Sequence, residues 1–157
     1  SSDVCSSDLT PGLAYEQANV APNSTLPVQE IGYNYRVSFD IDGTKEAMGT
    51  ELFRSQDAVF YLSDPISGML GFARDGYLNT FTYNVQPGQR MNIAIEGDNK
   101  ATRLFINGKQ VEELNIQERW MDKEGKSRMR NVRTLVFPLE KAGNFQSKIT
   151  NLKVEQK

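Results

Sequence analysis

The sequence predicts an all-β domain, built as a two-sheet antiparallel β-sandwich of jelly-roll type. Three observations lead to this prediction. Short segments with an apolar residue at every second position recur along the chain, and turn signals rich in Gly, Asn, Asp and Pro separate them. Helical periodicity is almost absent. The length of 157 residues suits one domain that buries its core without disulfides.

The stretch 91–114 has the clearest pattern and predicts a three-stranded antiparallel meander. Apolar and polar residues alternate over its first six positions, as in a half-buried strand. Asn107-Gly108 is the dipeptide most typical of a type I′ hairpin turn, because both of its residues tolerate positive φ. With a four-residue turn at 97–100, the expected strands are 91–96, 101–106 and 109–114.

These two turns also set an expected register. The expected cross-strand pairs are Met91 with Ile106, Ile93 with Leu104, Leu104 with Val111, and Arg103 with Glu112. One face of the meander then carries the apolar side chains, and the other carries a favourable pair of opposite charges.

The same period of two predicts the remaining strands. The strand at 33–41 has an aromatic and β-branched face, and Asp75-Gly76 predicts a second tight hairpin. The expected strands outside the meander are an edge strand at 13–19, then 33–41, 51–54, 58–62, 69–74, 77–84, 134–137 and 148–155. The long polar stretch 115–133 lacks alternation, and we expect an excursion with a helical turn there.

The first nine residues differ from the rest of the chain. The segment SSDVCSSDL is small, polar and without periodicity, and it resembles the translation of a sequencing-library adapter. We therefore expect a non-native segment at 1–9, an extended lead-in from an absent upstream domain at 10–30, and the β-sandwich domain at 31–157.

The composition excludes several classes of function. Without Asp3 and Asp8 the chain has 18 acidic and 18 basic residues, and this neutrality argues against a nucleic-acid partner. The sequence contains no histidine, and its one cysteine, Cys5, lies in the adapter-like segment. His-based catalytic triads, His-ligated zinc and thiol chemistry are therefore excluded. No apolar run approaches the length of a membrane span.

The hairpin sequence LFINGK at 104–109 and the closing segment KITNLKV at 148–154 resemble the laminin-G-like branch of the concanavalin A-like lectin/glucanase fold. Three further segments, LPVQEIGYNYRVSFDI, GFARDGYLNTFTYNV and RTLVFPLEKAGN, are similar to the non-catalytic domain that follows the catalytic barrel in bacterial family 20 glycoside hydrolases. These enzymes are the β-N-acetylhexosaminidases, and the likeness is to those of Bacteroidetes in particular. The resemblance implies a domain of a secreted or cell-envelope glycosidase.

Asp40 and Asp42 are the closest approach to a catalytic carboxylate pair, because residues two apart on a strand share a face. The E-x-D-x-x-E run of glucanases with this fold is absent. An acid pair or a cation site is one interpretation. We favour the other, in which Asp42 belongs to a turn and Asp40 is solvated. Because calcium is common among laminin-G-like domains, the resemblance also implies a Ca²⁺ site, with ligands from Asp40, Asp42 and Asn151.

Aromatic residues suggest two candidate sugar sites, because pyranose rings stack on aromatic faces. Tyr77, Asn79 and Tyr83 lie on one face of the strand expected at 77–84. They form either a stacking platform or part of the core, and the core is favoured because aromatic residues dominate buried faces. Trp120 is the better candidate, since it lies in the polar excursion. Its alternative is an anchor that packs against the sandwich or a neighbouring domain.

From these observations we expect a non-catalytic accessory domain that packs on, or assists, the catalytic barrel of the same polypeptide. The resemblance places it in the periplasm, at the cell surface or outside the cell. The alternative is an autonomous carbohydrate-binding module whose partners are glycans. A third interpretation, a small glucanase in its own right, is disfavoured by the missing carboxylate pair.

Overall fold

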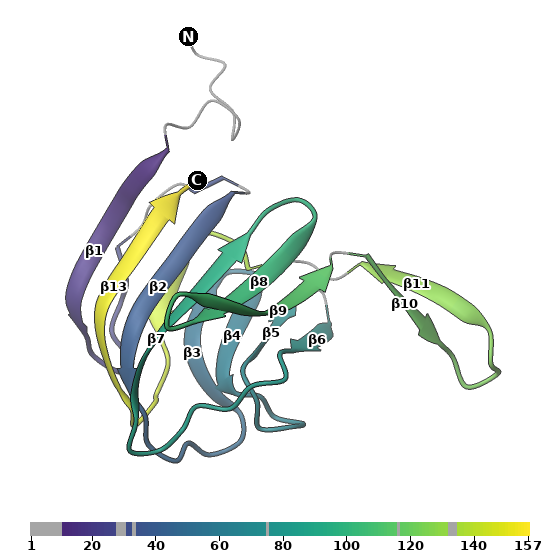
Figure 1. The fold of residues 1–157 in the computed structure, drawn as a ribbon, viewed down its shortest axis with the longest axis horizontal. Helices are drawn as coiled ribbons and strands as arrows, with labels where there is room; N and C mark the ends of the chain where they lie inside the picture. The colour runs from purple at the N-terminus through teal and green to yellow at the C-terminus, as the bar shows by residue number, and fades with distance from the viewer. Residues whose placement is uncertain (1–10, 28–30, 33, 75, 116, 132–134) are drawn as a thin grey trace, which may run out of the picture.

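The computed structural model describes residues 11–27, 31–32, 34–74, 76–115, 117–131 and 135–157, with backbone alone at 117–120 and 129–131. Two antiparallel sheets face each other in a sandwich, and a separate hairpin extends from it (Figure 1). This arrangement confirms the predicted all-β sandwich. No helix occurs in the described part of the chain, so none there could cross a membrane.

The first sheet has six strands in the order β1-β13-β2-β7-β8-β9. Its strands are β1 (Gly12–Val20), β13 (Lys148–Gln156), β2 (Tyr35–Asp42), β7 (Arg90–Gly97), β8 (Ala101–Ile106) and β9 (Lys109–Asn115). The expected edge strand near the start of the chain is β1, and it pairs with the closing strand β13. The origin of residues 10–30 in an upstream domain stays a prediction.

The second sheet has five strands in the order β12-β3-β4-β5-β6. Its strands are β12 (Leu139–Ala142), β3 (Thr50–Ser55), β4 (Ala58–Ser63), β5 (Gly71–Arg74) and β6 (Tyr77–Thr80). The tight hairpin expected after β5 is present, because Arg74 pairs with Tyr77.

The core lies between the two sheets, where their alternating apolar residues meet. Along β2 every second side chain is buried, from Tyr35 to Ile41. Phe39 of β2 packs edge to face on Phe53 of β3, with ring centroids 6.0 Å apart. Each such side chain contributes about 1.5–3 kcal/mol on burial. The period of two therefore places the apolar side chains of each strand in the core and leaves the polar side chains on the outer face, where they can contact a ligand.

The register of the central meander differs from the expected one. Ile93 pairs with Ile106, and Ile95 pairs with Leu104, two residues from the predicted pairs. The cause is the turn, since Asp98 Oδ1 accepts hydrogen bonds from the amides of Lys100 and Ala101 and tightens it. A shift of two positions preserves the faces, so the apolar side remains apolar.

The last strand of the meander contains a β-bulge that the sequence prediction missed. Leu104 pairs with Glu112 and Phe105 with Gln110, so Val111 is the extra residue. The predicted pairs of Leu104 with Val111 and Arg103 with Glu112 are therefore wrong. The side chain of Val111 is 44% exposed and does not lie on the buried apolar face of the meander. Arg103 forms ion pairs with Glu113 at 2.8 Å and with Asp98 at 2.9 Å.

Two further predictions are wrong in the second half of the chain. The stretch 115–133 has no helical turn in its described residues but forms an antiparallel hairpin of β10 (Gln117–Met121) and β11 (Ser127–Asn131). Figure 1 shows this hairpin extending away from the sandwich. Residues 135–137, expected as strand, are not strand, and β12 begins only after Pro138. Residue 134 lies outside the described residues.

Candidate functional site

Polar residues on the outer face of the six-stranded sheet form rows that cross the strands. One row consists of Thr150, Asp40 and Asn92, which are cross-strand partners on β13, β2 and β7. Cross-strand partners lie on the same face, only about 5 Å apart. The neighbouring row contains Glu16, Lys153, Ser38, Ala94 and Phe105 in that order.

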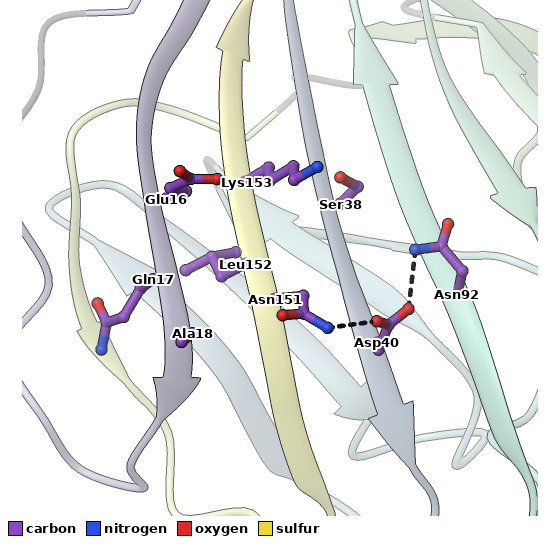
Figure 2. A pocket seen from close by; sticks show the side chains of 9 residues that line it. All are labelled: Glu16, Gln17, Ala18, Ser38, Asp40, Asn92, Asn151, Leu152 and Lys153. Atoms are coloured by element: carbon purple, nitrogen blue, oxygen red, sulfur yellow. Dashed lines mark hydrogen bonds between the residues drawn. The ribbon is translucent and has the colours of Figure 1, made fainter.

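A groove of about 590 Å³ lies over β1, β13, β2 and β7 on this face (Figure 2). Its polar lining is supplied by Glu16, Gln17, Ser38, Asp40, Asn92, Asn151 and Lys153. These residues belong to β1, β13, β2 and β7, which are distant in sequence and adjacent in the sheet. The groove is therefore a product of strand order and not of any local motif.

A carboxylate held between two amides lies at one end of this groove. Asp40 Oδ2 accepts a hydrogen bond from Asn151 Nδ2 at 2.8 Å, and Asp40 Oδ1 accepts one from Asn92 Nδ2 at 3.1 Å. Figure 2 draws both bonds, with the two amides reaching Asp40 from the strands on either side. We call Asp40, Asn92 and Asn151 the amide–carboxylate cluster.

Asn151 owes its position to a second β-bulge. The register of β13 against β2 shifts by one residue between Thr150 and Lys153. Within this bulge Asn151 has φ of 53°, a left-handed conformation that residues other than glycine rarely adopt. Bulges re-aim side chains, and here the amide is directed onto Asp40.

The cluster keeps the carboxyl group of Asp40 ionised. The hydrogen bonds from Asn151 and Asn92 lower its pKa from the ordinary value of 3.8, and the positive charge of Arg90 adds to this effect. Partial burial acts in the opposite direction but does not cancel it. Asp40 is therefore an anionic hydrogen-bond acceptor at neutral pH.

Arg90 lies between the two aspartates that the sequence analysis singled out. Its guanidinium is 2.9 Å from Asp42 Oδ2 and 3.5 Å from Asp40 Oδ2. The structure thus brings together Asp40, Asp42 and Asn151, the three residues expected to ligate calcium, but it places a guanidinium beside both carboxylates. No cluster of three or more acidic, His or Cys side chains suited to a metal occurs in the described ranges.

Binding of Ca²⁺ therefore stays a prediction, and the position of Arg90 argues against it. Thermal melting with calcium and with a chelator tests the site, and an unchanged Tm would remove it from consideration.

An aromatic ring lies on β8, at the end of the second of these rows. Phe105 is half-buried on the outer face, and the guanidinium carbon of Arg36 lies 5.1 Å from its ring centroid. Arg36 is itself held by Glu96, at 3.2 Å. Ala94 separates Phe105 from Ser38 and the groove. The guanidinium of Arg36 therefore covers one face of this ring, and the ring lies one strand beyond the groove lining.

The aromatic residues predicted as a platform do not form one exposed surface. Asn79 is 3% exposed and shares the inner face with Phe72, its cross-strand partner. Tyr77 is 42% exposed at the start of the same strand. Tyr83 lies beyond the end of β6, packs against the core, and donates from its hydroxyl to Met91 Sδ at 3.5 Å. Asn79 and Tyr83 thus lie with the core and Tyr77 does not, and a role of these residues in sugar binding stays a prediction.

Trp120 lies in β10, where its backbone pairs with Arg128. Its side chain is outside the described part of the structure, so its role in binding or anchoring stays a prediction.

The sequence analysis missed Asn92, Arg90, Phe105 and Lys153 as site residues. All four occupy the polar or outward positions of alternating strands, where solvent contact is the ordinary expectation. A run of Asp and Asn at equivalent outward positions of three strands would have been a signal. It becomes visible only when the strand order is known.

No protein-family model matches the chain, and no curated protein sequence matches it. The structure is similar to that of galectin LEC-6 from Caenorhabditis elegans, with a TM-score of 0.54 and 13% identity over 88% of this chain and 94% of that chain. Domain 4 of AbnA, a GH43 extracellular arabinanase from Geobacillus stearothermophilus in complex with arabinotriose, matches with a TM-score of 0.47 and 14% identity over 95% and 84% of the two chains. The galectin match agrees with the β-sandwich fold.

Proposed function

We propose that this domain is a non-catalytic carbohydrate-binding module of lectin type, which binds a saccharide on the outer face of its six-stranded sheet. The observation that carries the proposal is the amide–carboxylate cluster at the groove. Saccharides are recognised by fixed amide and carboxylate groups that bind their hydroxyls and by aromatic rings that bind their apolar faces. The cluster supplies the first element, and Phe105 on β8 is the aromatic ring on the same face, outside the groove lining.

The geometry favours binding over catalysis. Glycoside hydrolysis requires one carboxyl group that donates a proton and another that acts as nucleophile or base. Asp40 accepts hydrogen bonds from two amides, and Asp42 is ion-paired with Arg90 at 2.9 Å. Neither carboxylate is placed to give a proton to a leaving group. The likeness to a galectin agrees with this proposal at the level of architecture alone.

The parent protein is a separate part of the proposal. The sequence resemblance supports a longer secreted or envelope glycosidase, specifically a β-N-acetylhexosaminidase, in which the domain contacts the catalytic barrel. Sequencing the gene upstream of Thr10 tests this proposal. A barrel with the Asp-Glu pair of family 20 would support it, and a different upstream domain would reject it.

Binding to a glycan array, followed by calorimetry on the strongest ligand, tests the proposed function. We expect wild-type protein to bind at least one glycan and Asp40→Ala to lose at least about tenfold in affinity, because a charged hydrogen bond contributes about 1.5–3 kcal/mol. Asp57→Ala is the matched control, since Asp57 is exposed in the turn between β3 and β4, outside the groove. Equal affinities of wild type and Asp40→Ala would reject the site.

A further inference from the structure

The amide groups of the cluster have a fixed orientation, because each of them donates an N–H to Asp40. Asn92 Nδ2 donates to Asp40 Oδ1 at 3.1 Å and to the carbonyl of Phe39 at 3.3 Å, which uses both of its hydrogens. Asn151 Nδ2 donates to Asp40 Oδ2 at 2.8 Å. Both amide oxygens consequently point away from Asp40, as Figure 2 shows.

The groups that remain for a ligand in this part of the groove are mainly acceptors. Among the residues that the structure describes, none donates a hydrogen bond to Oδ1 of Asn92 or of Asn151. An ionised carboxylate has about four acceptor positions, so Asp40 keeps capacity beyond its bonds to the two amides and to Arg90. Glu16 adds a second carboxylate on the other side of the groove.

The charges around the groove also disfavour an anionic ligand group. Its lining contains two carboxylates, Glu16 and Asp40, and one ammonium group, that of Lys153. The nearby guanidinium of Arg90 is already paired with Asp42 at 2.9 Å and with Asp40 at 3.5 Å. A ligand carboxylate or sulfate next to the cluster would face Asp40 and two carbonyl oxygens, which repel it and leave the amide oxygens without a donor.

We infer that the groove takes an uncharged saccharide that donates neighbouring free hydroxyls to Asp40, Asn92 and Asn151, and that it rejects uronic acids and sulfated sugars. This inference rests on the proposed function. A sugar hydroxyl donates one hydrogen and also accepts, so it pairs with each free oxygen of the cluster. An anionic sugar group offers only acceptors at the same position.

The discrimination is measurable as an affinity ratio. One unpaired buried acceptor corresponds to about a tenfold loss of affinity or more. We therefore expect neutral glycans to bind at least about ten times more tightly than matched glycans whose hydroxymethyl group is oxidised to a carboxylate.

A glycan array with neutral, uronic-acid, sulfated and cationic amino-sugar members in similar numbers, probed with wild-type protein, tests the inference. The strongest neutral glycan is then titrated by calorimetry at 50 and at 500 mM NaCl. We expect Kd to change less than about twofold, because neutral ligands have no ionic attraction for salt to screen. Asp40→Asn, which keeps the shape but replaces an acceptor by a donor, should bind the same glycan at least about ten times more weakly.

The possible outcomes separate the inference from the proposal on which it rests. Neutral hits with salt-independent affinity support both. Strongest binding to a uronic-acid, sulfated or cationic amino sugar, or a Kd that rises more than about fivefold with salt, overturns the inference while saccharide binding stands. Absence of binding to every glycan overturns the proposed function and the inference with it.

Discussion

At the residue scale, the backbone conformation of Asn151 is the most informative feature of the site. A left-handed conformation of a residue other than glycine costs about 1 kcal/mol and persists where the surroundings demand it. Here the hydrogen bond from the Asn151 amide to Asp40 offsets this cost. The strained backbone and an amide that lines the groove are thus properties of one residue.

This feature predicts that Asn151→Gly separates stability from function. Glycine adopts the same conformation without strain, so we expect Tm to remain within about 3 °C of wild type. The amide is lost, and Asp40 loses one donor. Asn23→Gly is the matched control, because Asn23 has φ of 60° and lies outside the groove. Thermal melting of both variants checks the expectation, and a fall of more than about 8 °C for Asn151→Gly alone would show that its amide is structural.

The carboxyl group of Asp64 makes the stability of the fold depend on pH in acid. It is fully buried in the loop between β4 and β5. Burial by itself would raise the pKa of its carboxyl, but hydrogen bonds from the hydroxyl of Ser67, the amides of Ser67 and Ile66, and the hydroxyl of Thr80 outweigh it and lower the pKa. A lowered folded-state pKa stabilises the fold above the unfolded value, 3.8, and this contribution disappears as pH falls through the folded-state pKa.

We therefore expect Asp64→Asn to reduce the free energy of unfolding by about 2 kcal/mol at pH 7. The difference from wild type should shrink as the pH falls below 3.8. Urea unfolding of the two proteins between pH 7 and pH 3 measures it, with Asp57→Asn as the exposed control. A difference that grows in acid would contradict the assigned hydrogen bonds.

At the element scale, much of the fold is readable from the sequence and the site is not. Alternation predicts β2 and β7 and their buried faces, and Asn107-Gly108 predicts the turn between β8 and β9 correctly. The bulges at Val111 and Asn151 have no local signature, because each depends on what the strand meets across the sheet or groove. The site needs strand order as well, since β13 and β2 are adjacent in the sheet and far apart in sequence.

The bulge at Val111 has a consequence for the edge of the sandwich. The carboxylate of Glu112 accepts a hydrogen bond from the amide of Thr82 at 2.7 Å, which connects β9 of one sheet to the segment after β6 of the other. We expect Glu112→Ala to lower the free energy of unfolding by about 1 kcal/mol, or Tm by about 2–4 °C. Gln110→Ala, an exposed change on the same strand, is the control. Equal melting temperatures for the two variants would exclude this role for Glu112.

At the scale of the whole molecule, the sandwich and the hairpin of β10 and β11 are structurally separate. The cross-strand pairs of β10 and β11 are all with each other, and the hairpin extends from the body of the domain. A two-stranded hairpin is marginally stable by itself in water. The groove, by contrast, is lined by strands of the six-stranded sheet alone, and the core lies between the two large sheets.

Replacing residues 117–131 by a short Gly-Ser linker should therefore leave Tm within about 3 °C of wild type and glycan affinity within about twofold. This variant also removes Trp120, the sugar-stacking candidate of the sequence analysis. Melting and calorimetry on the same preparation decide between the two locations. Loss of binding with an unchanged Tm would assign the site to the hairpin and away from the groove.

The most direct test of a saccharide site on the six-stranded sheet is calorimetric titration of the strongest array ligand into wild type, Asn151→Gly and Asn23→Gly. The account predicts that wild type and Asn23→Gly bind equally, and that Asn151→Gly binds at least about ten times more weakly at an unchanged Tm. Equal affinity of all three proteins would contradict it, because the groove would then bind nothing through its amide–carboxylate cluster.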